Sequence, residues 1–471
     1  MPQPETPPPA ATDPLRLLRS RAYVKLLVLA AIVGVPISAA AYGFLKLVAA
    51  LQKTVFQTVP DALGLDPVPS WWPLPLLVLA GVLVAPAIVR LPGAGGHSPA
   101  DGFKAAGPVA PTELPSIVLA ALGTLSFGVV LGPEAPLILM GSGLGVLAVR
   151  LTARDAPPTA ASVLAAAGSF AAISALLGSP LLGAFLLLEA AGLGGAMVGV
   201  ILLPGLLAAG IGSLIFLGLD SLTGFGTFSL EIPGLPSFDR LTVAMFGYAL
   251  VFGAAAPLLG RAITRLALSI RPHVERRMTL AMPIVGAAIG LLAIVFAEVS
   301  GESTSMVLFS GQDQMGPLLE QAPAWSVGTL LLLIGCKGLA YSASLSSFRG
   351  GPVFPAMFLG AAGGVAASGL PGLPLVPAVA MGIGAMSCAM LRLPLTSTLL
   401  ATLLLGADGV QSMPVVIVAV VVSHVVTAHL TPAPETVAHS DPRPAMPAKS
   451  VRGAPAQPVG TTSGADPQAA G

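Results

Sequence analysis

Two short segments of this chain are versions of each other. GPEAPLILMGSGLG at residues 132–145 and GPVFPAMFLGAAGG at residues 351–364 share glycine and proline at five equivalent positions, with a constant offset of 219 residues. Each begins with Gly-Pro, which suits the start of a helix, and continues as an apolar run that crosses part of a bilayer. Interrupted hydrophobic segments repeated in two halves of a chain are typical of transporters with a substrate site near the membrane midplane. The repeat therefore predicts movement of a substrate across a bilayer.

The composition agrees with a membrane location. The 471 residues are 55% hydrophobic and 9% charged, with a mean hydropathy of +0.89, which leaves too little polar surface to cover a soluble globule. The net charge of +1 gives no reason to expect a nucleic-acid partner. The two cysteines lie inside apolar runs, so we expect neither a disulfide framework nor a metal site, and no cofactor.

Basic side chains gather in two regions that flank apolar runs. By the positive-inside rule both regions face the cytoplasm, and we expect both termini there, in a multi-pass protein of the cell membrane. The basic residues are Arg16, Arg19, Arg21 and Lys25 in the first region and Arg261, Arg265, Arg271, Arg276 and Arg277 in the second.

The repeat extends beyond its opening motif, since SPLLGAFLLLE and LPLTSTLLATL again pair a proline start with an apolar run. Several such runs are shorter than the roughly 20 residues of a full crossing. Broken helices at membrane depth are tolerated only where protein or an internal cavity surrounds them. The pattern alone leaves open whether the halves are parallel or inverted. The predicted organisation is a disordered cytoplasmic tail (1–20), a first membrane repeat (21–219), a connecting loop (220–236), a second membrane repeat (237–431) and a disordered tail (432–471).

Glu134 is a carboxylate inside an apolar segment, where the comparable Asp costs about 2.5 to 3.5 kcal/mol on insertion scales. One interpretation is a structural carboxyl that is protonated or hydrogen-bonded. The other uses its position at a helix N-terminus, where free backbone N–H groups favour an anion. A carboxylate there occupies the place of a transported anion and swings aside when it takes up a proton. Glu134 would then be a gate.

Five features follow one another along the chain: GGHSP (95–99), GPEAP (132–136), GSPLLGAFLLLE (178–189), Lys337 and SLSSFRGGPVFPAMFLG (344–360). Together they resemble the CLC family of chloride channels and proton/chloride antiporters, over about residues 21–431. The resemblance implies an all-α polytopic membrane protein with two inverted-repeat halves of tilted and broken transmembrane helices. It also implies a homodimer in the lipid bilayer, in which each subunit has its own pathway for chloride or similar small anions.

The resemblance also implies site residues. Glu134 matches the gating glutamate, GGHSP matches the loop that supplies a serine hydroxyl on the intracellular side, and GPVF matches the segment whose backbone N–H groups face the anion. Several partial positive charges hold an anion in a low-dielectric pore without binding it too tightly for flux. The implied anion-binding residues are Gly95, Gly96, His97, Ser98, Gly132, Pro133, Ala135, Gly351, Pro352, Val353 and Phe354.

The chain departs from the family pattern at three of these places. Pro133 replaces the arginine that usually precedes the gate, so a positive charge is missing there. The loop reads GGHSP in place of GSGIP, which leaves His97 or Ser98 to substitute for the usual serine. Pro352 has no N–H to offer the anion. These changes predict weaker or differently selective anion binding.

Coupling to protons is a further departure. Glu189 aligns one residue before the internal glutamate of the proton-coupled members, and Ala190 occupies that place. The pore tyrosine near the C-terminal end is absent, because Tyr341 is the last tyrosine. Both changes favour a passive or weakly coupled conductor, of the voltage-gated chloride channel type, over the alternative, a tightly coupled proton/chloride antiporter. Glu189 itself is open to interpretation as a helix-packing or dimer-side carboxyl.

Two cations near the second motif have two interpretations each. Lys337 supplies positive potential to an anion path, or its side chain extends to the membrane interface. Arg349 replaces the charge missing at Pro133, or it is an ordinary loop arginine.

Two other functional classes fit less well. The chain has no HExxH, no GxSxG and no paired intramembrane aspartates, so we do not expect an enzyme. A cation-coupled transporter would carry more intramembrane carboxylates than Glu134, Glu189 and Glu298.

Overall fold

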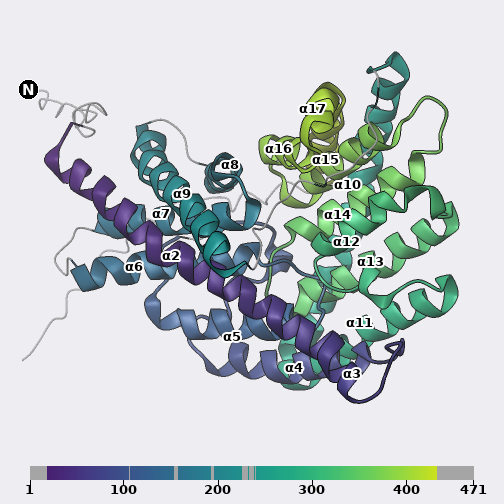
Figure 1. Cartoon of the computed structure of the whole chain (residues 1–471), viewed down its shortest axis with the longest axis horizontal. Helices are drawn as coiled ribbons and strands as arrows, with labels where there is room; N and C mark the ends of the chain where they lie inside the picture. The colour runs from purple at the N-terminus through teal and green to yellow at the C-terminus, as the bar shows by residue number, and fades with distance from the viewer. Residues whose placement is uncertain are drawn as a thin grey trace, which may run out of the picture. The chain divides into compact units, whose positions relative to one another are not determined.

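The computed structural model of the chain describes residues 19–104, 107–152, 158–192, 196–224, 232, 238 and 240–431. These residues form helices and connecting loops, with one isolated antiparallel bridge (Figure 1). The first-half helices are α2 (Arg21–Lys53), α3 (Val59–Ala62), α4 (Pro73–Arg90), α5 (Leu114–Leu125), α6 (Glu134–Thr152), α7 (Pro158–Leu177), α8 (Pro180–Ala191) and α9 (Ala196–Thr223). The second-half helices are α10 (Val243–Arg276), α11 (Met278–Ser300), α12 (Gln312–Glu320), α13 (Val327–Ser347), α14 (Val353–Ala367), α15 (Leu375–Leu391), α16 (Pro394–Leu404) and α17 (Gly406–Leu430).

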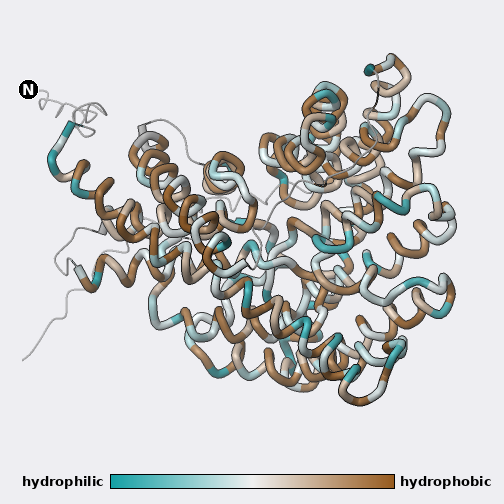
Figure 2. Tube along the Cα trace, viewed as in Figure 1, coloured by the Kyte–Doolittle hydropathy of each residue, from teal (hydrophilic) through white to brown (hydrophobic). Residues whose placement is uncertain are grey.

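Hydrophobic residues dominate these helices, as Figure 2 shows by the extent of brown along the trace. Nine of the described helical stretches are long and apolar enough to cross a bilayer. The chain is therefore an integral, multi-pass membrane protein. The shorter apolar helical stretches are Pro111–Leu125, Pro180–Ala191, Val353–Ala367, Leu375–Leu391 and Pro394–Leu404.

The predicted breaks coincide with helix starts. Pro180 and Pro394 are the first residues of α8 and α16, a position where the missing N–H costs no helical bond. Ser179 caps α8, because its hydroxyl accepts a hydrogen bond from Leu182 N. These two helices are too short to cross the bilayer alone, as the sequence predicted.

The second half repeats the packing of the first. α6 packs against α7 and α7 against α9, as α14 packs against α15 and α15 against α17. α2 packs against α9 as α10 packs against α17, and the counterparts α4 and α11 pack on each other. With the family comparisons given below, this arrangement confirms the predicted fold class of two repeated halves of broken transmembrane helices.

Glycines of the repeated motif let the helices of each half approach closely. A β-carbon at Gly141 of α6 would overlap the carbonyl oxygen of Gly168 in α7. The equivalent pair in the second half is Gly360 of α14 and Gly382 of α15, with the same overlap. Small residues at helix contacts are the usual means of close packing in membranes. The motif glycines at these positions therefore pack helices and do not bind a substrate.

The predicted tails lie outside the described residues, apart from Arg19 and Ser20. Of the predicted connecting loop, residues 220–224 and 232 are described, and α9 extends into it as far as Thr223.

Candidate functional site

The two repeated motifs meet at their first residues. Gly132 N donates to Gly351 O at 2.8 Å and Gly351 N donates to Gly132 O at 2.6 Å, which forms an isolated antiparallel bridge. These two glycines are equivalent positions of the repeat, so they lie where the two halves mirror each other. The bridge brings the N-termini of α6 and α14 side by side.

Glu134, the first residue of α6, lies in the gap between these N-termini. Its side chain is fully buried, and its Oε1 accepts a hydrogen bond of 2.9 Å from Phe354 N on α14. Its Oε2 has no hydrogen-bond partner among the described residues. A β-carbon at Gly132 or at Gly351 would overlap this carboxylate. Glycine is therefore required at both positions to leave room for the side chain.

The carboxylate of Glu134 lies at a place where a bound anion would be stabilised. Free backbone N–H groups at a helix N-terminus carry partial positive charge. Phe354 is the second residue of α14, and Pro352 before the helix has no N–H. The first-half carboxylate thus binds the N-terminus of a second-half helix, which is a place where a small anion would compete with it.

The GGHSP loop lies beside this pair of motifs. Gly95 and Gly96 have φ of 71° and 90°, which L side chains rarely adopt, so the loop needs both glycines. Arg349 holds the loop in place, because its Nε donates to Ala94 O at 3.1 Å and its Nη1 to Phe348 O at 3.2 Å. Arg349 is only 9% exposed. These contacts support the interpretation of Arg349 as a structural loop arginine, and the replacement of the charge missing at Pro133 stays a prediction.

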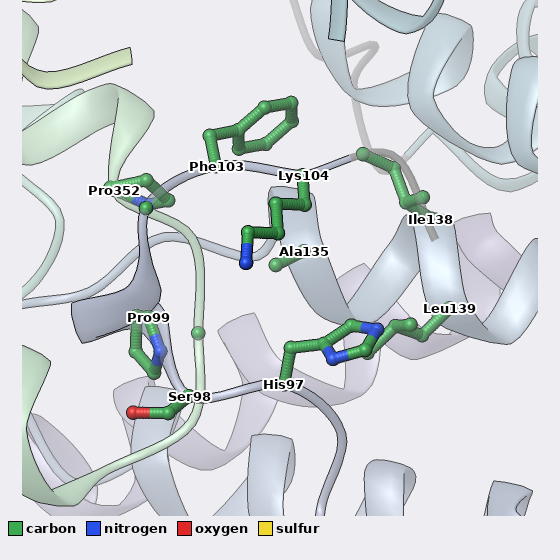
Figure 3. Close-up of a pocket in the computed structure, with 11 residues that line it drawn as sticks. His97, Ser98, Pro99, Phe103, Lys104, Ala135, Ile138, Leu139 and Pro352 are labelled. Carbon is green, nitrogen blue, oxygen red and sulfur yellow. The ribbon is translucent and has the colours of Figure 1, made fainter. Parts of the chain in front are cut away.

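A small cavity of about 30 Å³ opens next to Glu134 (Figure 3). Its wall includes Ala135, which follows Glu134 on α6, and Pro352, which precedes α14. His97 and Ser98 of the GGHSP loop also line it, and the Lys104 side chain extends into it. The structure thus brings the three predicted segments together around one small chamber.

A larger cavity of about 470 Å³ adjoins the chamber and shares Lys104 and Pro352 with it. It is bordered by α10 and by the end of α15, where Arg392 lies. Asp101 on its rim forms an ion pair with Arg271 of α10, at 2.5 Å between Oδ1 and Nη1. This pair ties the loop that follows GGHSP to α10.

A third cavity of about 830 Å³ lies at the far end of α11 from Arg277, between the end of α2 and the start of α4. Lys53, Glu302 and Asp313 are among its charged residues. Burial raises the pKa of the Asp313 carboxyl. At 1.5 Å per residue, α11 separates this cavity from the α10–α11 turn by roughly 30 Å, about the thickness of a bilayer core.

Lys337 of α13 is fully buried. Its Nζ donates to the carbonyl oxygens of Met306, Val307 and Leu308 at 3.0 Å each and to Phe309 O at 3.4 Å. The same Nζ lies 4.4 Å from the centroid of the Phe358 ring on α14. The interpretation in which Lys337 extends to the membrane interface is therefore wrong.

Glu189 joins the two halves at another point. Its Oε1 accepts from Leu395 N at 2.9 Å, and its Oε2 accepts from Thr396 N at 2.8 Å and Thr396 Oγ1 at 2.6 Å. The carboxylate of α8 thus caps the N-terminus of α16. This contact supports the packing interpretation of Glu189.

Two residues of the site escaped the sequence analysis. Tyr341 is fully buried on α13, and its hydroxyl donates to Pro352 O at 2.8 Å. A tyrosine within an apolar segment needs a partner for its hydroxyl, and that need was the one available signal. Lys104 lies after the GGHSP motif and outside it, so no sequence motif pointed to this residue.

Within the described ranges, no group of three or more His, Cys, Asp or Glu side chains is arranged to hold a metal ion. His424 contacts Cys388 instead, with 3.9 Å between Nδ1 and Sγ.

Known sequences resemble this chain over most of its length. Residues 100–428 match the model of a family described as voltage gated chloride channel. The chain is 28% identical over 354 residues to YfeO of Salmonella newport, an ion-transport candidate, covering 74% of this chain and 81% of that one. YfeO of Salmonella choleraesuis is 29% identical with the same coverage.

Solved structures share the fold at low sequence identity. A slow cyanobacterial Cl⁻/H⁺ antiporter superposes with a TM-score of 0.69 at 20% identity, covering 87% of this chain and 95% of that one. A CLC-type fluoride/proton antiporter gives 0.64 at 20% identity, covering 85% and 95%. A eukaryotic CLC transporter gives 0.64 at 15% identity, covering 88% and 73%.

Proposed function

The chain belongs to the CLC family of voltage gated chloride channels and moves anions across the membrane by a CLC-type pathway; we propose that chloride is its anion and that Glu134 is the gate. The observation that carries the proposal is the 2.9 Å hydrogen bond from Phe354 N to Glu134 Oε1. A chloride ion arriving at the start of α14 competes with this carboxylate for the same N–H group.

Protonation releases the gate. A neutral carboxyl binds the positive end of α14 more weakly than a carboxylate does, so it yields its place to chloride. Val353, Phe354 and Ala135 then offer backbone N–H groups, and Ser98 or His97 contacts the ion in the chamber next to Glu134. Gly95, Gly96, Gly132, Pro133, Gly351 and Pro352 shape the backbone of this path, and Arg349 and Lys337 provide its positive potential.

The basic turn between α10 and α11 supports a cytoplasmic position for the chamber, by the positive-inside rule. Arg271, next to the larger cavity, belongs to that turn region. The cavity with Asp313 then faces the outside. We place both termini in the cytoplasm, the chain in the cell membrane as a homodimer, and its two repeats at residues 21–219 and 237–431.

A passive conductor fits this chain better than a coupled antiporter. Glu189, the carboxylate nearest in sequence to the family's internal proton acceptor, is bound by three donors at the start of α16. A carboxylate held by three donors is committed to capping α16, which leaves it no free oxygen facing the path of a proton carrier. The antiporter alternative draws on two of the similar solved structures, a Cl⁻/H⁺ antiporter and a fluoride/proton antiporter.

Flux measurements on the reconstituted protein test the proposal. Chloride and protons are recorded together from liposomes loaded with a chloride gradient. We expect chloride efflux without uphill proton movement, whereas proton uptake against its gradient would identify an antiporter. If neither chloride nor fluoride moves faster than from protein-free liposomes, the proposed function is wrong.

Gly351→Ala is expected to open the gate. The added β-carbon would overlap Glu134 Oε2, so the carboxylate is displaced from Phe354 N. Losing one charge-assisted hydrogen bond of about 1.5 kcal/mol corresponds to about tenfold faster chloride flux at neutral pH. Gly363→Ala is the matched control, because a β-carbon there meets no atom within 4 Å on the same helix. A Gly351→Ala protein that folds and retains slow, pH-dependent flux would contradict this account.

A further inference from the structure

Lys104 occupies the junction of the two cytoplasmic-side cavities. It lines both the chamber next to Glu134 and the larger cavity beside α10. Figure 3 shows its amino group near the middle of the view, among the side chains that line the chamber. An ion passing from the larger cavity to the gate therefore passes this amino group.

The chamber has little other full charge. Among the described residues that line it, Lys104 is the one lysine or arginine, and no aspartate or glutamate is present. The carboxylate nearest along the chain, Asp101, is bound to Arg271. Lys104 thus has no acidic neighbour in the chamber to neutralise it, and the position before Glu134 is Pro133, which carries no charge.

We propose that Lys104 captures the transported anion at the inner mouth and delivers it to the α14 N-terminus, in place of a cation beside the gate. This inference rests on the proposed function of chloride conduction. The ligand is a small monovalent anion, because the chamber of about 30 Å³ has one cationic side chain, the hydroxyl of Ser98 and the ring of His97 to offer. A larger polyanion would find no second cation in the chamber.

The exposure of Lys104 suits capture better than tight binding. Its side chain is solvent-exposed, so water screens its attraction and lets the ion leave. A charged side chain in a cleft raises the local concentration of its counter-ion and the rate of entry. The effect is therefore greatest at low chloride and from the side of the membrane on which the cavity opens.

Lys104→Gln should raise the half-saturating chloride concentration on one side of the membrane only. We expect an increase of about fivefold to tenfold at low ionic strength, the effect of one charge near the ion. The maximal flux should change little, and Lys104→Arg should behave as the wild-type chain. Lys53→Gln is the matched control, because Lys53 is also exposed but lines the cavity at the opposite end of α11.

A second measurement restores the charge in the folded protein. Lys104→Cys is treated with a methanethiosulfonate reagent that attaches either an ammonium or a sulfonate group. Cys336 and Cys388 are buried, so the wild-type chain treated in parallel serves as the control. The ammonium adduct should recover flux at low chloride, and the sulfonate adduct should reduce it further.

The outcomes separate the two claims. The assignment of Lys104 is overturned if Lys104→Gln leaves the half-saturating concentration unchanged, if Lys53→Gln shifts it on the same side, or if both adducts act alike. Absence of chloride flux from the wild-type chain would instead overturn the proposed function itself.

Discussion

Chloride flux through Glu134→Ala is expected to be about tenfold faster than through the wild-type chain at neutral pH, the equivalent of one charge-assisted hydrogen bond. It should also be independent of pH. In the wild-type chain, acid protonates the carboxyl and weakens its hold on Phe354 N, so flux should rise as the pH falls. Without the carboxyl, no group competes with chloride for the start of α14.

Glu134→Gln separates the charge from the space that the side chain fills. A neutral amide resembles the protonated carboxyl, so this variant should also lose its pH dependence, while its bulk keeps its flux below that of Glu134→Ala. Glu298→Gln is the control, because Glu298 is exposed near the end of α11 and accepts a hydrogen bond from Ser70 Oγ at 2.6 Å. If Glu298→Gln removes the pH dependence and Glu134→Gln does not, Glu134 is not the gate.

Lys337→Met is expected to have the largest effect on stability. The carbonyl groups of Met306, Val307 and Leu308 would lose the amino group that binds all of them in the protein interior. Each unsatisfied buried group costs about 1 to 3 kcal/mol. We therefore expect the free energy of unfolding to fall by about 3 to 5 kcal/mol. Thermal unfolding of the detergent-solubilised protein, followed by size-exclusion chromatography, measures the change.

The control for this variant is Lys53→Met, which removes an exposed lysine and should change stability by about 0.5 kcal/mol or less. Lys337→Arg is informative as well, because a planar guanidinium does not fit the compact arrangement of carbonyls around Nζ. Equal thermal stability of Lys337→Met and the wild-type chain would mean that these hydrogen bonds contribute nothing to the fold.

The sequence was informative where function depends on local pattern. The Gly-Pro repeat predicted helix starts beside Gly132 and Gly351, and α6 and α14 begin two residues after these glycines. Glu134 stands out as a candidate gate because a carboxylate at the start of an apolar helix is unusual. These features need only neighbouring residues to be recognised, and family resemblance supplied the rest of the fold.

Long-range contacts were not predictable in the same way. Whether Arg349 is buried depends on Ala94 and Gly95, which lie far from it in the chain. The environment of Lys337 depends on a turn at residues 306–309 that has no motif of its own. The role proposed for Lys104 depends on a cavity that three separate segments of the chain form together. In each case a partner distant in sequence decides what the side chain does.

The bonds between Gly132 and Gly351 put the proposed conduction path at the seam between the two repeats. One half contributes the acidic side chain and the other contributes the amide that receives it. Neither half, produced by itself, would contain a complete ion site.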